Sequence, residues 1–171
     1  MNPAVPADNG ASVSQPASVA WPDALREAAF WRWFNPLAPA HGLRADTLAP
    51  ASADASFRRY LRVATADGRS LIVMDAPPPH EDVRPFIDVA RRLQAAGLHA
   101  PAVLAADESL GFVLLADLGN DLYLKALQTG EPGRADRLMR EAVAALVHLQ
   151  RDVDATGLPP YDDALLRREL A

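Results

Sequence analysis

The sequence has 171 residues, enough for one domain or for one lobe and part of another, and half of them are hydrophobic, so a sizeable core can form. The formal net charge of −5 gives no support to binding of nucleic acid or of a membrane surface. The sequence holds no cysteine, which excludes disulfides, thiolate metal sites and a cysteine nucleophile. No apolar run approaches the roughly 20 residues of a membrane span, and we expect a cytoplasmic protein.

The first 20 residues are rich in proline, alanine and serine, and we expect a disordered tail there. They contain no basic segment followed by an apolar one, so no Sec-type signal is predicted. A short helix is predicted from Pro22 to about Pro36, and its buried face comprises Leu25, Ala28, Ala29 and Trp33. The three tryptophans suit either a platform for a sugar ring or packing of this helix onto the rest of the lobe, and we favour packing.

The centre of the prediction is a loop of small residues at 51–56 that leads into a strand at 57–63. Side chains in this strand alternate with the period of two that a strand requires. A turn at 66–69 and a nearly all-apolar strand at 70–76 follow, and three prolines end that strand because proline cannot donate to a ladder. An earlier strand at 43–50 is weakly indicated.

The remaining elements are a helix, two strands and then helices alone. The helix at 82–96 has an apolar stripe at a spacing of 3.6 residues, formed by Phe86, Val89, Ala90, Leu93 and Ala96. Strands are predicted at 101–105 and 111–118, and helices at 122–128 and 135–152. The inward-facing residues of the long helix are expected to be Leu138, Ala142, Ala145, Leu146 and Leu149. Another helix is predicted to start at Asp162, which would be its N-cap. The sequence stops within this helix without a helix-terminating signal, so we expect a truncated chain.

Four segments stand out in this order: DASFRRYLRV (54–63), LIVMDAPPP (71–79), GLHAPAVLAADESLGFVLLADLGNDLYL (97–124) and LPPYDDALLRREL (158–170). Together they resemble the N-terminal half of the aminoglycoside-phosphotransferase-like kinases, in particular the bacterial N-acetylmuramate/N-acetylglucosamine anomeric kinases. The resemblance implies an α+β fold, a protein-kinase-like N-terminal lobe with a five-stranded antiparallel sheet and one long helix. This lobe would span 21–118 with its N-terminal helix and hinge, and 119–171 would begin a helical second lobe.

The resemblance also implies an ATP-binding site. Residues 52–56 would lie over the phosphates, among them Ser52, Ala53, Asp54 and Ser56. Ile72 would cover the adenine, on the same strand face as Met74, and Leu115 would lie at the back of the pocket. The hinge, whose backbone groups would bind the adenine edge, would comprise Ala116, Asp117 and Leu118.

Two departures from the family pattern concern the phosphates. Met74 takes the place of the phosphate-binding lysine, and Asp88 on the following helix has no such lysine to pair with. Arg58 and Arg59 are the obvious substitutes, although two arginines on a strand equally suit a solvated outer face. The loop also lacks glycine, and Ala53 stands where related sequences usually carry one, which limits how closely its backbone approaches a phosphate.

The catalytic and metal-binding parts are not found in this chain. The superfamily uses an H-x-D-x-x-x-x-N loop, and His80-Glu81-Asp82 matches only its first three letters, with Ile87 at the asparagine position. Asp117-Leu118-Gly119 is assigned to the hinge rather than to a metal-binding D-F-G motif, because no H-x-D loop precedes it. His148 is interpreted as a surface histidine.

These observations lead to two hypotheses of different classes. In the first, the chain is the N-terminal portion of an ATP- and Mg²⁺-dependent sugar kinase acting on a cell-wall amino sugar, and this portion alone is inactive. In the second, it is a non-catalytic nucleotide-binding or scaffolding module, which Met74 and the glycine-free loop favour. The partners expected under the first hypothesis are ATP and a small sugar acceptor, with neither nucleic acid nor membrane.

Overall fold

The structure, a computed structural model of the chain, describes residues 19–53, 57–128 and 130–170. The tail predicted at the N-terminus therefore lies outside the described residues, apart from its last two positions. Contacts divide the chain into two units, which are described separately here. One takes in the described residues up to Val83 together with Leu104–Asp117, and the other comprises Arg84–Val103 and the described residues from Leu118 onward. None of the described helices is long and apolar enough to cross a membrane.

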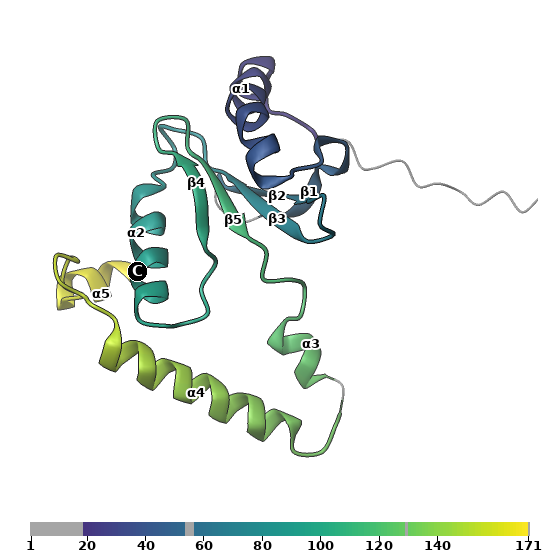
Figure 1. The fold of residues 1–171 in the computed structure, drawn as a ribbon. Coiled ribbons are helices and arrows are strands. Elements are labelled where there is room, and N and C mark those ends of the chain that lie inside the picture. Colours follow the sequence, from purple (N-terminus) through teal and green to yellow (C-terminus); the bar gives the residue numbers. More distant parts are fainter. Residues whose placement is uncertain (1–18, 54–56, 129, 171) are drawn as a thin grey trace, which may run out of the picture. The chain divides into compact units, whose positions relative to one another are not determined.

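A five-stranded antiparallel sheet is the centre of the first unit, and the predicted α+β fold is confirmed (Figure 1). The strands run in the spatial order β1-β2-β3-β5-β4. Their bounds are Ala49–Ala53 for β1, Arg59–Ala64 for β2, Ser70–Asp75 for β3, Val103–Asp107 for β4 and Phe112–Ala116 for β5. The two strands predicted most strongly from alternation and apolar content, β2 and β3, end within two residues of their predicted bounds.

Side chains that alternate along the strands give the sheet two different faces. One face carries the buried apolar residues of the main core, which from the strands are Leu61, Val63, Leu71, Val73, Phe112 and Leu114. The intervening residues form the other face, here called the Met74 face: Tyr60, Arg62, Ile72, Met74, Val113 and Leu115. The register Met74↔Tyr60 and Ile72↔Leu115 places them as neighbours across the central strands.

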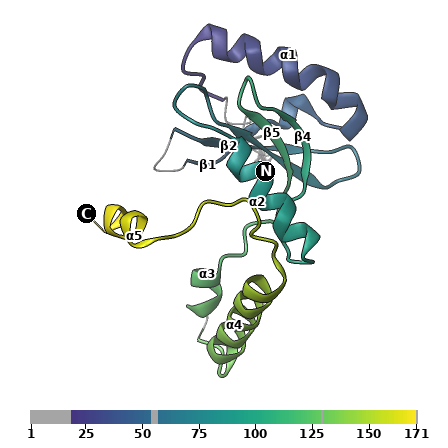
Figure 2. The same ribbon diagram turned by 90° about the vertical axis from the view of Figure 1, so that its left-hand side faces the viewer.

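The N-terminal helix α1, Ala24–His41, packs on the core face of the sheet (Figure 2). Asp23 caps its start by accepting a hydrogen bond from the Arg26 backbone N–H at 2.7 Å. The predicted buried face was half right: Ala29 and Trp33 pack against the core, whereas Leu25 is 84% exposed and Ala28 is exposed. The completely buried residues of the helix are Phe30 and Phe34. Large apolar side chains lie on several sides of this helix, so local periodicity does not identify the face that the sheet covers.

The predicted end of α1 near Pro36 was also wrong, since the helix continues to His41. Pro36 and Pro39 both lie inside the helix, and both are exposed. The carbonyls that lose a proline donor can therefore bind water, while the buried side of the helix stays intact. Gly42 then ends the helix in the left-handed conformation, with φ 62°.

An aromatic cluster joins α1 to the sheet. Trp33 stacks on Phe112 with ring centroids 5.3 Å apart, and Trp21 lies 4.7 Å from Phe30. Phe30 in turn meets the edge of Phe112 at 5.7 Å. The tryptophans Trp21, Trp31 and Trp33 are partly buried against the core, which confirms packing over a sugar platform.

The strand predicted at 43–50 was placed too early. Leu43 makes only an isolated bridge to Thr65, a 3₁₀ helix follows at Ala45–Thr47, and β1 begins at Ala49. Thr47 interrupts the pairing because its hydroxyl, rather than a backbone carbonyl, accepts the Ala64 N–H at 2.9 Å. Leu43 and Leu48 are both buried, but neither lies in the strand.

The second unit contains four helices among its described residues: α2 at Arg84–Ala95, α3 at Tyr123–Leu127, α4 at Arg134–Asp152 and α5 at Asp163–Glu169. The predicted N-cap is confirmed, because Asp162 accepts from the Leu165 backbone N–H at 2.9 Å. Arg92 of α2 donates to the carbonyl oxygens of Asp154 and Thr156, at 2.6 and 2.9 Å, and so fastens α2 to the segment between α4 and α5.

Two predicted apolar faces in this unit differ from the structure. In α2 the buried residues are Ile87 and Ala90, whereas Val89 is 42% exposed. In α4 no residue is buried, and Leu146 and Leu149 are 51% and 39% exposed. The inward face predicted for α4 is therefore only partly covered by the described residues, since Leu138 and Ala142 are half-buried.

Candidate functional site

The Met74 face of the sheet brings together three of the predicted site residues. Ile72 of β3 pairs with Leu115 of β5, and Met74 lies two positions further along β3. Met74 is completely buried, Leu115 is 3% exposed and Ile72 is half-buried. Of these three apolar residues only Ile72 is partly exposed, so it is the one that could contact a flat, apolar ring such as adenine.

The predicted phosphate loop is shorter than expected. Ser52 and Ala53 are the last residues of β1, where they pair with Tyr60 and Arg59, so they are strand residues rather than loop residues. The pairing was missed because small residues carry little strand signal. The sheet register shifts between Pro50 and Ser52. Asp54 and Ser56 lie outside the described residues.

The predicted hinge follows β5 directly. Ala116 ends that strand, and Leu118, which begins the second unit, is 50% exposed. The Asp117 carboxylate turns back to the sheet, where it accepts from Arg62 Nε at 2.6 Å and from the Ser70 hydroxyl at 2.6 Å. Its side chain is 6% exposed. This carboxylate is thus bound to two strands, and the role of the hinge backbone stays a prediction.

The two arginines proposed as substitutes for the missing lysine have different surroundings. Arg59 forms an ion pair with Asp75 and lies over the Trp21 ring, 4.8 Å from its centroid, which places it on the α1 side of the sheet. Arg59 is therefore not a cation of the Met74 face, and its inclusion among the substitutes was wrong. Arg58 instead donates from Nε to Glu81 at 2.9 Å, with its side chain 28% exposed.

A buried aspartate escaped the sequence analysis. Asp75 is 1% exposed and binds both Arg59 and Arg26 of α1. The one available signal was an acidic residue at the end of an otherwise apolar strand, LIVMD. Its partner on α1 lies 49 positions away, beyond the reach of any local pattern.

The residues of the chance match to a catalytic loop have other roles. His80 stacks on Phe57 with ring centroids 4.5 Å apart, and Glu81 binds Arg58. His148 lies on α4 with Nε2 3.2 Å from Asp152 Oδ2, and its side chain is 37% exposed. Within residues 19–53, 57–128 and 130–170, no three His, Asp or Glu side chains are grouped to hold a metal ion.

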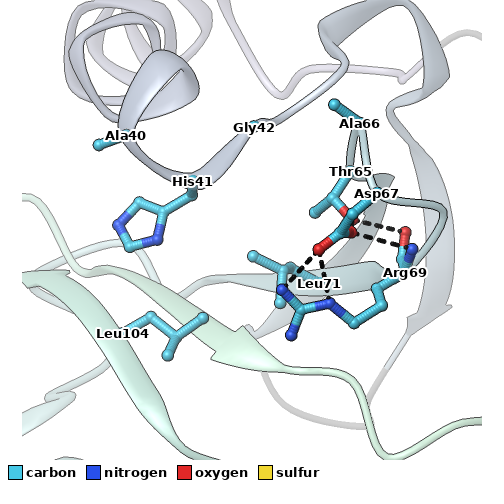
Figure 3. Close-up of a pocket in the computed structure, with 9 residues that line it drawn as sticks. All are labelled: Ala40, His41, Gly42, Thr65, Ala66, Asp67, Arg69, Leu71 and Leu104. Carbon is cyan, nitrogen blue, oxygen red and sulfur yellow. Dashed lines mark hydrogen bonds and ion pairs between the residues drawn. The ribbon is translucent and has the colours of Figure 1, made fainter.

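A cavity of about 390 Å³ lies in the first unit, where the end of α1 meets the β2–β3 turn (Figure 3). In that turn, Asp67 accepts from the Thr65 hydroxyl at 2.5 Å and from Arg69 Nε at 2.9 Å. These hydrogen bonds with Arg69 and Thr65 lower the pKa of Asp67 well below its usual range. Leu71, a residue of the core face, also lines this cavity, which is therefore separate from the Met74 face.

Three known proteins that are similar to this chain share one name, N-acetylmuramate/N-acetylglucosamine kinase. The chain is 56% identical to an N-acetylmuramate/N-acetylglucosamine kinase of Pseudomonas aeruginosa over 124 residues, which are 72% of this chain and 35% of that protein. It is 47% identical to the kinase of that name from Pseudomonas putida over 126 residues, covering 74% and 36% of the two chains. The corresponding protein of Neisseria meningitidis is 41% identical over 121 residues, 70% of this chain and 36% of that one.

The chain thus spans about a third of the length of the curated relatives it matches. The phosphotransferase enzyme family (APH) matches residues 47–171, which include the whole sheet and all the helices that follow it. The five-stranded antiparallel sheet is consistent with the kinase-like N-terminal lobe of that family. Since the match covers most of the sequence, the chain belongs to the phosphotransferase enzyme family.

Proposed function

We propose that this chain is the N-terminal part of an ATP-dependent sugar kinase, which transfers the γ-phosphoryl group of ATP to an amino sugar such as N-acetylmuramate or N-acetylglucosamine. The observation that carries the proposal is the identity of 41–56% to three relatives that are named as kinases of these two sugars. Such an enzyme would act in the cytoplasm, where ATP is available, and would return cell-wall amino sugars to metabolism.

The Met74 face supports this proposal. Ile72 and Leu115 would contact the adenine, and the backbone of Ala116, Asp117 and Leu118 would hydrogen-bond its edge. The segment that joins β1 to β2 would lie near the phosphates, where Arg58 would supply the charge that Met74 cannot. In the full-length enzyme, Arg58→Ala should then lower kcat/KM for ATP about tenfold or more.

Magnesium would be held by residues outside the described part of this chain, which offers no grouped set of acidic ligands. When bound, the ion would neutralise charge that develops on the transferred phosphoryl group. The residues described here would bind and orient the nucleotide.

A second candidate is a non-catalytic nucleotide-binding or scaffolding module. Two observations favour it: Met74 is completely buried in place of a phosphate-binding lysine, and the sequence at 51–56 lacks glycine. A module of this kind would bind nucleotide and would not turn it over, even in the full-length protein.

The test is ATP-dependent phosphorylation of N-acetylglucosamine and N-acetylmuramate by two purified proteins, the 171-residue chain and the full-length protein that contains it. We expect turnover by the full-length protein and none by the chain, which lacks an H-x-D-x-x-x-x-N loop. Turnover by the chain would overturn the fragment proposal. Nucleotide binding without turnover by the full-length protein would select the non-catalytic module.

A further inference from the structure

We propose that Glu81 is a positioning residue, which holds the Arg58 guanidinium on the Met74 face so that this cation, in place of a β3 lysine, binds a phosphate of the nucleotide. The inference rests on the proposed nucleotide binding. It assigns to Arg58 and Glu81 the part that an ion pair between a β3 lysine and a helix glutamate plays in protein kinases.

The first step concerns Met74. Its side chain is completely buried on the face that carries Ile72 and Leu115. A thioether carries no charge and is only a weak hydrogen-bond acceptor. Strand β3 therefore supplies neither a charge nor an exposed side chain at this position, so a bound phosphate requires a cation from a neighbouring element.

The second step concerns the neighbouring strand. Successive residues of a strand point to opposite faces, so Arg62 shares the face of Tyr60 and Met74. Arg58 precedes the strand, and its side chain interacts with that of Tyr60. Arg62 lies at the hinge end of β2, where its Nε binds Asp117 at 2.6 Å. Arg58 directly precedes β2 and lies at the end that joins β1. Of these two cations, Arg58 is the one at the end where the proposed site would hold the phosphates.

The third step concerns how Arg58 is held. Glu81 Oε2 accepts from Arg58 Nε at 2.9 Å, and the carboxylate side chain is 11% exposed while the arginine side chain is 28% exposed. Glu81 itself is fixed by a turn, because its backbone N–H donates to the Pro77 carbonyl at 3.2 Å. Glu81 is thus mostly buried and held by the hydrogen bond of its turn, and it orients the more exposed guanidinium of Arg58.

The chemistry of the guanidinium fits this role. It has five N–H donors in a planar fork and can hold a carboxylate and a phosphate at once. Burial lowers the pKa of Arg58, but hydrogen bonding and charge from Glu81, and then from Tyr60, raise it overall, so the cation stays fully charged. A purely structural ion pair between β2 and the turn after β3 would have the same geometry, and binding experiments can separate the two roles.

The experiment measures the affinities of ATP and adenosine by titration calorimetry, with the full-length protein that contains this chain. We expect Arg58→Gln to weaken ATP binding about tenfold or more, because hydrogen bonds to charged groups are strong, and to leave adenosine binding unchanged. Glu81→Gln should weaken ATP binding in the same selective way. Adding Glu81→Gln to Arg58→Gln should cause no further loss, since Glu81 acts through Arg58. Arg58→Lys should recover part of the affinity.

Arg44→Gln is the matched control, because Arg44 also pairs with an acid, Asp46, but is 55% exposed and directly precedes the 3₁₀ helix at Ala45–Thr47. It should alter neither affinity. Equal losses for ATP and adenosine in the Arg58 and Glu81 variants would assign the pair a structural role and overturn the inference, as would unchanged ATP affinity. A wild-type protein that binds neither ligand would instead overturn the proposed nucleotide binding on which the inference rests.

Discussion

Arg26 of α1 and Asp75 of β3 form an ion pair that fastens the N-terminal helix to the central strand of the sheet. Arg26 donates to Asp75 Oδ1 from Nε at 2.9 Å and from Nη2 at 2.6 Å. The same guanidinium donates to the Leu110 carbonyl at 2.7 Å and lies 3.8 Å from the centre of the Phe112 ring. One side chain therefore joins α1, β3 and the turn before β5.

The first prediction concerns the loss of this buried carboxylate. Asp75→Ala should lower the free energy of unfolding by about 3–5 kcal/mol, because it leaves two arginine cations without their counter-charge in a mostly buried position. Urea denaturation of the chain measures it. The control is Asp46→Ala, which breaks an ion pair whose partners are 55% and 69% exposed and should cost less than about 1 kcal/mol. Equal losses in the two variants would contradict the buried role of Asp75.

The second prediction concerns Gly111. Its φ is 70°, and a Cβ at this position would overlap the carbonyl oxygen of Ala76, whose N–H binds the Gly111 carbonyl at 2.9 Å. Gly111→Ala should destabilise the chain by roughly 3 kcal/mol or more, from backbone strain and displacement of β3 together. Gly68→Ala is the control, since φ is 83° there and nothing lies within 4 Å of the added Cβ. It should cost only about 1–2 kcal/mol of strain. If the two substitutions cost the same, contact with Ala76 is unimportant.

The third prediction is a pH dependence that arises at the β4–β5 turn. The Asp107 carboxylate accepts from the Ser109 hydroxyl at 2.6 Å and from the Leu110 N–H at 2.9 Å, and these bonds lower its pKa although its partial burial acts to raise it. A folded-state pKa below the unfolded one gives a stabilising contribution that is complete above the unfolded value, near pH 4, and is lost as the pH falls through the folded value.

Asp107→Asn removes this charge with little change of shape. Wild-type and variant chains should therefore differ most in thermal stability at neutral pH, and their melting temperatures should converge as the pH falls below about 4. Melting curves between neutral and acid pH test this. A difference that stays constant over the whole range would show that the charge of Asp107 does not contribute.

The fourth prediction concerns the uncovered side of α4. Val143, Leu146 and Val147 are 60%, 51% and 53% exposed, and apolar patches of this kind favour association. The isolated chain should self-associate at micromolar concentration, and sedimentation across a concentration series would detect it. Val147→Lys should shift the chain toward monomer, whereas Gln150→Lys, with the same added charge on the same helix, should not. A monomer at every concentration would contradict this prediction.

Local patterns in the sequence predicted much of the fold. The alternation through Leu61 and Val63 and the apolar run from Leu71 to Met74 predicted β2 and β3, and the capping residue Asp162 marked the start of α5. Each of these signals depends on neighbours a few residues away. The completely buried residues of α1, Phe30 and Phe34, could not be predicted in this way, because the sheet determines which apolar side of the helix is covered.

The candidate site was less accessible to sequence reasoning, for a related reason. Ile72 and Leu115 are neighbours only through the β3–β5 register, and no local pattern in the sequence predicts that register. The bonds from Arg62 to Asp117 and from Arg58 to Glu81 join residues 55 and 23 positions apart. A sequence shows such charges but does not show which pairs meet, so Glu81 attracted notice only through a chance motif.

The placement of α1 has a consequence for how the limits of this domain are drawn. The family match begins at residue 47, yet Phe30 and Phe34 of α1 belong to the same buried cluster as Val63, Val73 and Phe112. A protein trimmed to the family boundary would expose that cluster and leave Asp75 without Arg26. The unit of homology and the unit of folding therefore differ here, and a domain prepared for biophysical work should start before Trp21, whose ring lies against Phe30.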